Sequence, residues 1–192
     1  MKTRILFGTL ACAAVIGGAL VVPGCGTTST STTSTAVKPT AKSAVTVLPV
    51  AKNPIVNDAT AEGLKITSAM VENNVDPVTK KDISDRLQIG VKNTSGETLS
   101  DMQLFYQMTD SVTKKSEGYY QKLTGLSLNA GETKTVYFDT DSGTGHYPEN
   151  IYSLYRTSAN EVVISIEISA VGFKPAMGEV KKAKGTGEKA GE

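Results

Sequence analysis

Alternating apolar and polar residues recur through the second half of the chain, and this pattern constrains the fold more than any other feature. A period of two places alternate side chains on the buried face of a β-strand and leaves the others in water. The alternation is clearest where every even-numbered residue from Val162 to Ala170 is apolar. The segments with this pattern are 64–71, 86–93, 101–108, 132–140 and 161–173. In the first segment we expect Leu64, Ile66 and Met70 to share the buried face.

Turn-forming sequences separate these segments, namely NTSGE at 93–97, NAGE at 129–132 and DSGTG at 141–145. Several short strands joined by regular turns favour a β-sandwich over β-α-β units. One helical turn is expected within 148–156, where Ile151, Leu154 and Tyr155 have three- and four-residue spacing. The pattern therefore predicts an all-β fold, an immunoglobulin-like antiparallel β-sandwich over residues 63–175.

The first 24 residues have the layout of a secretory signal, because Lys2 and Arg4 precede an uncharged apolar run. That run has about 20 apolar or small residues, which is also long enough to span a bilayer without cleavage. Two alternatives follow from composition alone. The segment is either a signal peptide over residues 1–24 or an uncleaved membrane anchor.

The segment Val22-Pro23-Gly24-Cys25 resembles the lipobox of bacterial lipoproteins. Members of that family carry an aliphatic residue three positions before the cysteine and a small residue directly before it; Pro23 departs from the usual pattern. The resemblance implies that the thiol of Cys25 is diacylated and that cleavage makes Cys25 the first residue of the mature chain. Two acyl chains hold a protein durably, since each buried methylene contributes about 0.8 kcal/mol. The expected location is the extracytoplasmic face of the cell membrane.

Residues 25–62 are dominated by Thr, Ser and Ala with scattered Pro, so we expect the acylated cysteine to be followed by a flexible linker. Residues 176–192 are polar and rich in Lys, Gly and Glu, and we expect a disordered tail there. The other cysteine, Cys12, lies within the apolar run and would be removed with a signal peptide. One remaining cysteine cannot form an internal disulfide, so the domain must be stabilised by its core.

The stretch from Leu87 to Asp110, followed by 126–140, resembles FxLYD-type and related immunoglobulin-like domains of bacterial lipoproteins. The shared features are the turn Asn93-Thr94-Ser95-Gly96 and the sequence 128–133, LNAGET, before a further strand. The Phe-x-Leu-Tyr-Asp signature itself is absent, and LFYQMTD stands in its place. The resemblance implies a sandwich fold and an envelope location rather than a particular activity.

Candidate chemistry is sparse in this sequence. His146 is the only histidine, which excludes a metal cluster built from several histidines. A Ser-His-Asp catalytic triad would have to use this one residue. Asp139, Asp141 and Glu149 are weak candidates for a calcium site, since oxygen ligands at alternate positions are what Ca²⁺ prefers. The alternative is that the two aspartates simply solvate the end of a hairpin.

Tyrosines near the predicted turns are candidates for contact with a partner. Tyrosine offers a large contact area with one hydrogen-bonding tip, which suits recognition of proteins or sugars. The candidates are Tyr119, Tyr120 and Tyr147. The alternative is that these rings cover the ends of the sandwich core.

Overall charge argues against nucleic acid as a partner, because 20 basic and 19 acidic residues nearly cancel. We predict a monomeric, non-enzymatic module without a cofactor, tethered to the membrane through Cys25 and presenting a strand edge or loops to an envelope protein. The alternative class is a lipoprotein that binds a small ligand or calcium, of the kind that serves a transporter.

Overall fold

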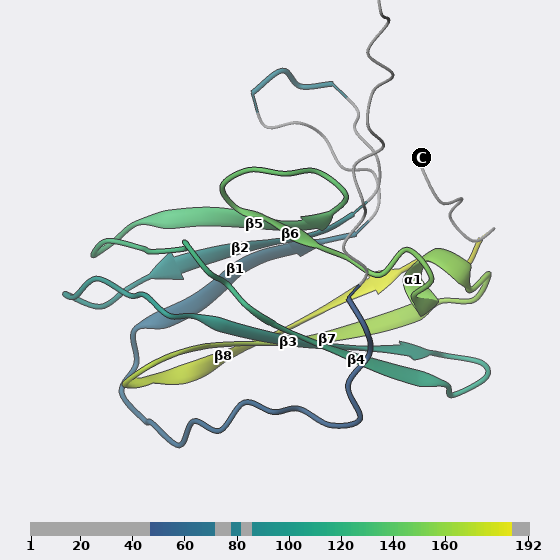
Figure 1. The fold of residues 1–192 in the computed structure, drawn as a ribbon, viewed down its shortest axis with the longest axis horizontal. Coiled ribbons are helices and arrows are strands. Elements are labelled where there is room, and N and C mark those ends of the chain that lie inside the picture. The colour runs from purple at the N-terminus through teal and green to yellow at the C-terminus, as the bar shows by residue number, and fades with distance from the viewer. Residues whose placement is uncertain (1–46, 72–77, 82–85, 186–192) are drawn as a thin grey trace, which may run out of the picture. The chain divides into compact units, whose positions relative to one another are not determined.

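Two four-stranded β-sheets face each other in the computed structural model (Figure 1), which describes residues 47–71, 78–81 and 86–185. Sheet 1 has the strand order β1 (Leu64–Met70), β2 (Leu87–Asn93), β5 (Thr133–Asp139), β6 (His146–Pro148). Sheet 2 has the order β4 (Ser116–Lys122), β3 (Gln103–Asp110), β7 (Val162–Ala170), β8 (Phe173–Lys182). All neighbouring strands are antiparallel except the short parallel pair β5 and β6. The prediction of an all-β sandwich is confirmed.

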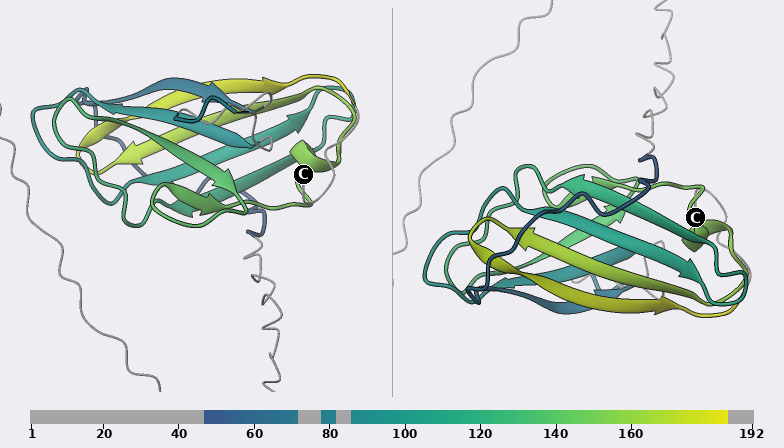
Figure 2. Two further views of the ribbon diagram at one scale, coloured as in Figure 1. Left: turned by 90° about the horizontal axis from the view of Figure 1, so that it is seen from above. Right: turned by 90° about the horizontal axis from the view of Figure 1, so that it is seen from below.

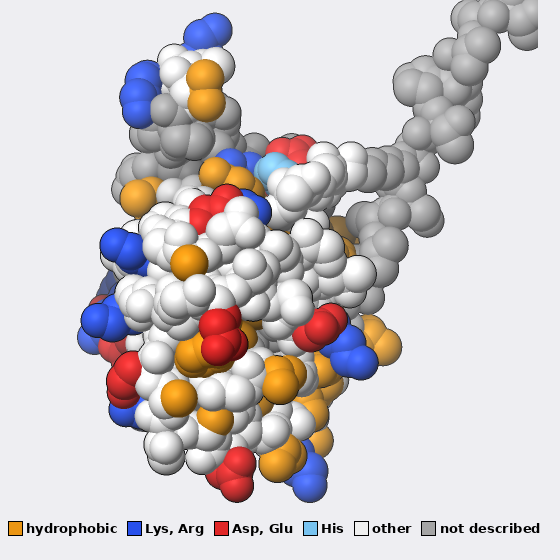
Figure 3. Space-filling model, turned by 90° about the vertical axis from the view of Figure 1, so that its left-hand side faces the viewer, with side chains coloured by type: hydrophobic (Ala, Val, Ile, Leu, Met, Phe, Trp, Pro, Cys, Tyr) orange, Lys and Arg blue, Asp and Glu red, His pale blue; other side chains and the backbone are white. Residues whose placement is uncertain are grey.

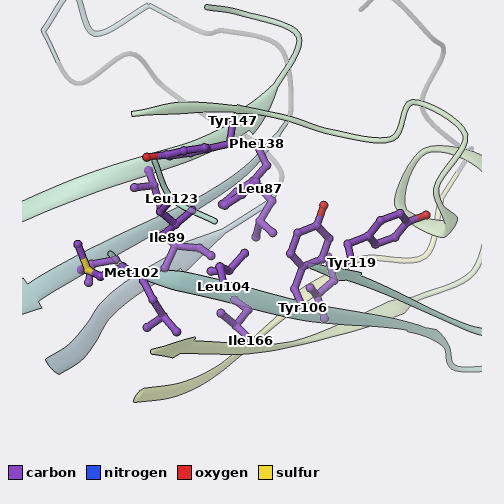
Figure 4. Packing of buried hydrophobic residues seen from close by; sticks show 14 of the residues in the cluster. Leu87, Ile89, Met102, Leu104, Tyr106, Tyr119, Leu123, Phe138, Tyr147 and Ile166 are labelled. Carbon is purple, nitrogen blue, oxygen red and sulfur yellow. The ribbon is translucent and has the colours of Figure 1, made fainter. Parts of the chain in front are cut away.

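The core between the sheets is formed largely by the apolar side chains that the period-two pattern predicts to be buried. Strand β7 buries Val162, Ile164, Ile166 and Ile168, and β3 buries its even-numbered residues from Leu104 to Met108. Four aromatic rings join the two layers, and Figure 4 shows them together: Tyr106 and Tyr119 from sheet 2, Phe138 and Tyr147 from sheet 1. The rings of Tyr106 and Tyr119 are stacked with centroids 5.2 Å apart. Tyr106 also meets Phe138 edge-on at 5.5 Å, so one tyrosine bridges the sheets.

Strand β1 departs from the predicted face. A β-bulge between Ile66 and Ser68 shifts its register against β2. One extra residue reverses the side on which later side chains lie, because the period of a strand is two. Met70 is therefore 39% exposed rather than buried, whereas Ala69 packs against the core and Val71 is buried.

The C-terminal boundary also differs from the prediction. Strand β8 continues through the predicted tail as far as Lys182, pairing along its length with β7. The sequence FKPAMGEVKK hides this strand because an edge strand buries little, and Pro175 and Gly178 resemble turn residues. The Lys182 ammonium group is itself buried, where it donates a hydrogen bond of 2.9 Å to the Ser158 carbonyl.

The predicted helical turn is present as α1 (Leu154–Thr157), a single turn at one end of the sandwich. Leu154 and Tyr155 are buried, as their spacing indicated. The Tyr155 hydroxyl donates a hydrogen bond to the Val71 carbonyl, which attaches this turn to the chain that follows β1.

The last part of the predicted linker is ordered against the domain. Residues 47–62, which we call the strap, cross the outer face of sheet 2, seen as the dark blue segment in the right-hand view of Figure 2. The strap then leads directly into β1. The predicted signal peptide, Cys25 and the linker as far as residue 46 lie outside the described residues, as do residues 186–192.

Candidate functional site

A group of charged side chains lies at one end of sheet 1, near the end of β5 and the start of β6. Asp139, the last residue of β5, is buried and forms an ion pair with buried Arg86, with Nη1 and Oδ2 2.7 Å apart. The more exposed Asp141 carboxylate lies 3.6 Å from the same guanidinium nitrogen. Arg86 immediately precedes β2, so the pairing of β2 with β5 brings the two residues together.

His146 joins this group from β6. Its Nδ1 lies 3.0 Å from each oxygen of the Asp139 carboxylate. The imidazole also stacks on the Tyr137 ring at 4.9 Å, and the Arg86 guanidinium lies 4.2 Å from the centroid of that same ring. The histidine, pale blue in Figure 3, lies beside acidic side chains. The Tyr137 ring thus contacts both the His146 imidazole and the Arg86 guanidinium, the two groups that bind the Asp139 carboxylate.

The structure separates the three residues predicted for calcium. Asp139 and Asp141 are neighbours, and their carboxylates with His146 Nδ1 lie within 4.8 Å of one another. Glu149 belongs elsewhere: its carboxylate is buried against Arg156, at 2.6 Å from Nη2. Because a guanidinium already occupies the space between the two aspartates, Asp139 has its counter-charge within the fold. This geometry favours a structural ion pair over a calcium site.

The three candidate tyrosines have different environments. Tyr119 and Tyr147 are buried in the core, where a partner cannot reach their rings. Burial raises the pKa of the Tyr119 hydroxyl, and its hydrogen bond of 2.7 Å to Glu117 raises it further. Tyr120 faces outward from β4 and is half-buried, with its hydroxyl donating to Gln103 at 2.7 Å. Of the three, Tyr120 alone remains a candidate contact, and the core-covering alternative describes the other two.

A pocket of about 400 Å³ lies at the opposite end of the sandwich, the end that faces the viewer in Figure 3. Its walls come from the start of β3 and the end of β4, together with the loop that follows β4 and the β7–β8 turn. Buried Met102, Leu123 and Leu126 border it, and exposed Asp101 and Lys122 place one charge of each sign at its rim. The volume falls within the range of small-molecule sites.

Sequence reasoning named Asp139, Asp141 and His146 but did not place Arg86 with them. Arg86 and Asp139 are 53 positions apart, and their contact depends on the register between β2 and β5. A local signal existed: an arginine just before one strand and an aspartate at the end of another lie at the same edge when the two strands pair antiparallel. The Glu149–Arg156 pair carried a comparable signal, since both residues lie within the segment 148–156 that was predicted to contain the helical turn.

Comparison with known proteins adds no family to this description, because neither a protein-family model nor a curated protein matches the chain. Within the residues that the structure describes, no helix is both long and apolar enough to cross a membrane. The class defined by the coordinates is an all-β protein of two packed four-stranded sheets.

Proposed function

We propose that this protein is a membrane-anchored extracytoplasmic lipoprotein whose β-sandwich acts as a non-enzymatic interaction module of the cell envelope. The lipobox-like sequence ending at Cys25 supports the anchor, and the Thr- and Ser-rich stretch after it supports a spacer. About 22 residues separate Cys25 from the strap, and covalent geometry limits such a chain to about 75 Å. The sandwich is then held within that distance of the bilayer.

One observation above all supports a non-enzymatic role. The two buried carboxylates among the candidate site residues each have a counter-charge within the fold: Asp139 pairs with Arg86, and Glu149 pairs with Arg156. A general acid or base must be free to exchange its proton with a substrate. A buried carboxylate in an ion pair with a guanidinium instead holds together the segments that carry the two partners.

An immunoglobulin-like domain of the FxLYD type is the finer class that we propose. The two sequence motifs behind that resemblance meet in space. The Asn93 side-chain amide donates to the Leu128 carbonyl at 3.0 Å, and its oxygen accepts the Ser95 amide at 2.8 Å. The backbone amide of Asn93 also donates to Glu132 at 2.9 Å. The N-x-S-G turn and the L-x-x-G-E-T segment thus stabilise each other, as a shared structural motif requires.

The anchor is tested by fractionating cells that produce the wild-type chain or the Cys25→Ala variant. We expect the wild type in the membrane fraction, labelled by a clickable palmitate analogue, and the variant unlabelled and uncleaved. Labelling that persists in the variant contradicts acylation at Cys25. A wild-type chain that keeps its first 24 residues in the membrane identifies the uncleaved anchor instead.

The interaction role is tested by crosslinking wild-type cells in intact envelopes. One recurrent protein partner, reduced when the variant is used, supports the module. If an anchored chain captures no protein, the interaction role is wrong.

A second candidate, binding of a small ligand, is favoured by the pocket between Asp101 and Lys122. Replacing Leu126, on its border, with Trp is expected to fill the pocket and abolish binding of any ligand found by screening. A hit that binds this variant equally well does not use the pocket.

For calcium we expect millimolar CaCl₂ to leave the thermal midpoint of unfolding unchanged, because Arg86 already neutralises Asp139. A midpoint that rises with CaCl₂ concentration contradicts this.

A further inference from the structure

The strap crosses sheet 2 as a single extended segment. Its side chains alternate between the sheet and the solvent: Asn53, Ile55, Asn57 and Ala59 are partly buried, whereas the residues between them are exposed. Two asparagines also shape its backbone, since the side-chain oxygen of Asn53 accepts the Ile55 amide and that of Asn57 accepts the Ala59 amide. The strap therefore lies flat on the sheet without being a ladder strand of it.

The polar contacts between the strap and the sandwich fall at separate points along the length of the strap. Near its start, the Val50 amide donates to the Gly118 carbonyl of edge strand β4 at 2.7 Å. In its middle, the Asn53 amide group donates to Glu167 at 2.7 Å. Further on, the Asn57 amide group donates to Ser169, to the Ala170 carbonyl and to the Phe173 carbonyl. At its end, the Ala61 carbonyl accepts the Lys174 amide at 2.8 Å.

The packing under the first half of the strap is incomplete. A pocket of about 390 Å³ lies between residues 49–53 and the outward-facing residues of β3 and β4, including Phe105 and Gln107. Over this stretch the strap therefore does not pack closely on the sheet. The approach at Gly118 also requires glycine, because a Cβ there would lie 2.9 Å from the Phe105 ring and 3.3 Å from the Val50 carbonyl oxygen.

We propose that the strap is a releasable latch, which detaches from sheet 2 while the sandwich stays folded. The core lies between the sheets, and of the strap residues only Val47 is packed against it. A segment with few buried apolar contacts opens at a much lower free-energy cost than the whole domain. The polar contacts follow one another along the strap from Val50 to Ala61. We therefore expect a pulling force applied at residue 47 to break them one after another.

Release has two consequences, and the first rests on the proposed membrane anchor. Freeing residues 47–62 lengthens the chain between Cys25 and the domain from about 22 to about 38 residues, so its limiting reach grows from about 75 Å to about 130 Å. The second consequence is independent of the anchor. Release removes the chain that covers the β4 edge at Gly118 and the outward face of Phe105.

Trypsin cleavage after Lys52 reports the opening, because this exposed lysine lies within the docked strap and a protease needs a locally detached chain. The experiment uses residues 25–192 with Cys25→Ala, which lack both the signal segment and the acylation site, so it does not depend on the anchor. We expect cleavage that depends only weakly on urea below the unfolding transition and leaves a folded sandwich. Asn53→Ala with Asn57→Ala should accelerate cleavage about tenfold while shifting the unfolding midpoint little.

Matched controls lie on the same segment. Val56→Ala and Asp58→Ala change exposed side chains and should leave the cleavage rate unchanged. Asn57→Cys with Ser169→Cys joins strap to sheet where the two side chains touch, and after oxidation cleavage should slow strongly. The proposal is overturned if cleavage in the wild type has the same urea dependence as global unfolding, or if the double alanine variant loses its sandwich when the strap opens. Fractionation of the Cys25→Ala variant tests the anchor separately.

Discussion

At the scale of single residues, we expect loss of the Arg86–Asp139 ion pair to lower the free energy of unfolding strongly. Both side chains are less than one-tenth exposed. Removing one partner leaves a buried charge without compensation, which typically costs about 3–5 kcal/mol. We expect Asp139→Asn to lower the free energy of unfolding by about 3 kcal/mol, since His146 and Tyr137 still contact the site. Urea denaturation at pH 7 measures this.

Asp141→Asn is the matched control, because its carboxylate faces the same guanidinium at 3.6 Å but its side chain is 69% exposed. An exposed ion pair contributes about 0–1 kcal/mol. A loss of stability as large as that of Asp139→Asn would show that the two carboxylates act as one unit. The ion-pair interpretation of Asp139 would then be wrong.

At the scale of elements, Asp110 connects the end of β3 to the chain that leads into β7. Its carboxylate accepts Ser158 Oγ at 2.6 Å and the Asn160 amide group at 3.0 Å, as well as the backbone amides of Val112 and Thr113 in the turn before β4. These bonds, that of Ser158 foremost, hold the pKa of Asp110 well below its ordinary value. The ionised carboxylate therefore stabilises three elements at once.

The pH dependence follows from the sign of that shift. A carboxyl group with a lowered folded-state pKa contributes its full stability above the unfolded-state value of about 4 and loses it as the pH falls towards the folded-state pKa. Asp110→Asn should therefore lower the urea midpoint at pH 7, with a difference from wild type that shrinks below pH 3. Asp101→Asn, at an exposed carboxylate, should change the midpoint little at either pH. A deficit in Asp110→Asn that stays constant down to pH 2 contradicts the charge-based account.

Strands that bury one face against the core could be predicted from the alternation of apolar and polar residues. Strands that lack this alternation, or whose register is shifted by a bulge, could not. β2, β3 and β7 each bury one complete face, and β5 buries Val136 and Phe138 on one face, so the period of two can be recognised in all four sequences. β8 buries too little, and in β4 Tyr119 faces the core while Tyr120 faces out, which breaks any visible alternation of apolar and polar types. The bulge in β1 leaves no local sign. The strap is attached by backbone groups and by asparagine amides, and the side-chain partners of Asn53 and Asn57 lie 114 and 112 positions away.

At the scale of the whole molecule, the stability of the domain should be independent of everything before the strap. Among the described residues, Val47 is the first that packs against the core cluster, and the compact unit that contains the cluster extends from Lys42 to Glu192. This unit contains no cysteine, so no disulfide contributes to its stability. A chain of this size with a single core is expected to unfold in one cooperative transition.

We therefore expect residues 42–192 and the chain from residue 26 to unfold in urea with the same midpoint and slope, each in one transition. The slope reports the surface exposed on unfolding, so equal slopes mean that residues 26–41 bury no surface against the domain. Adding a reducing agent should change neither curve. Circular dichroism in the β-strand region and tyrosine fluorescence provide two independent probes, the latter sensitive to the stacked Tyr106 and Tyr119 rings. A lower midpoint or a shallower slope for the shorter chain would show that the predicted linker packs against the sandwich, and the spacer role that we assign to it would have to be abandoned.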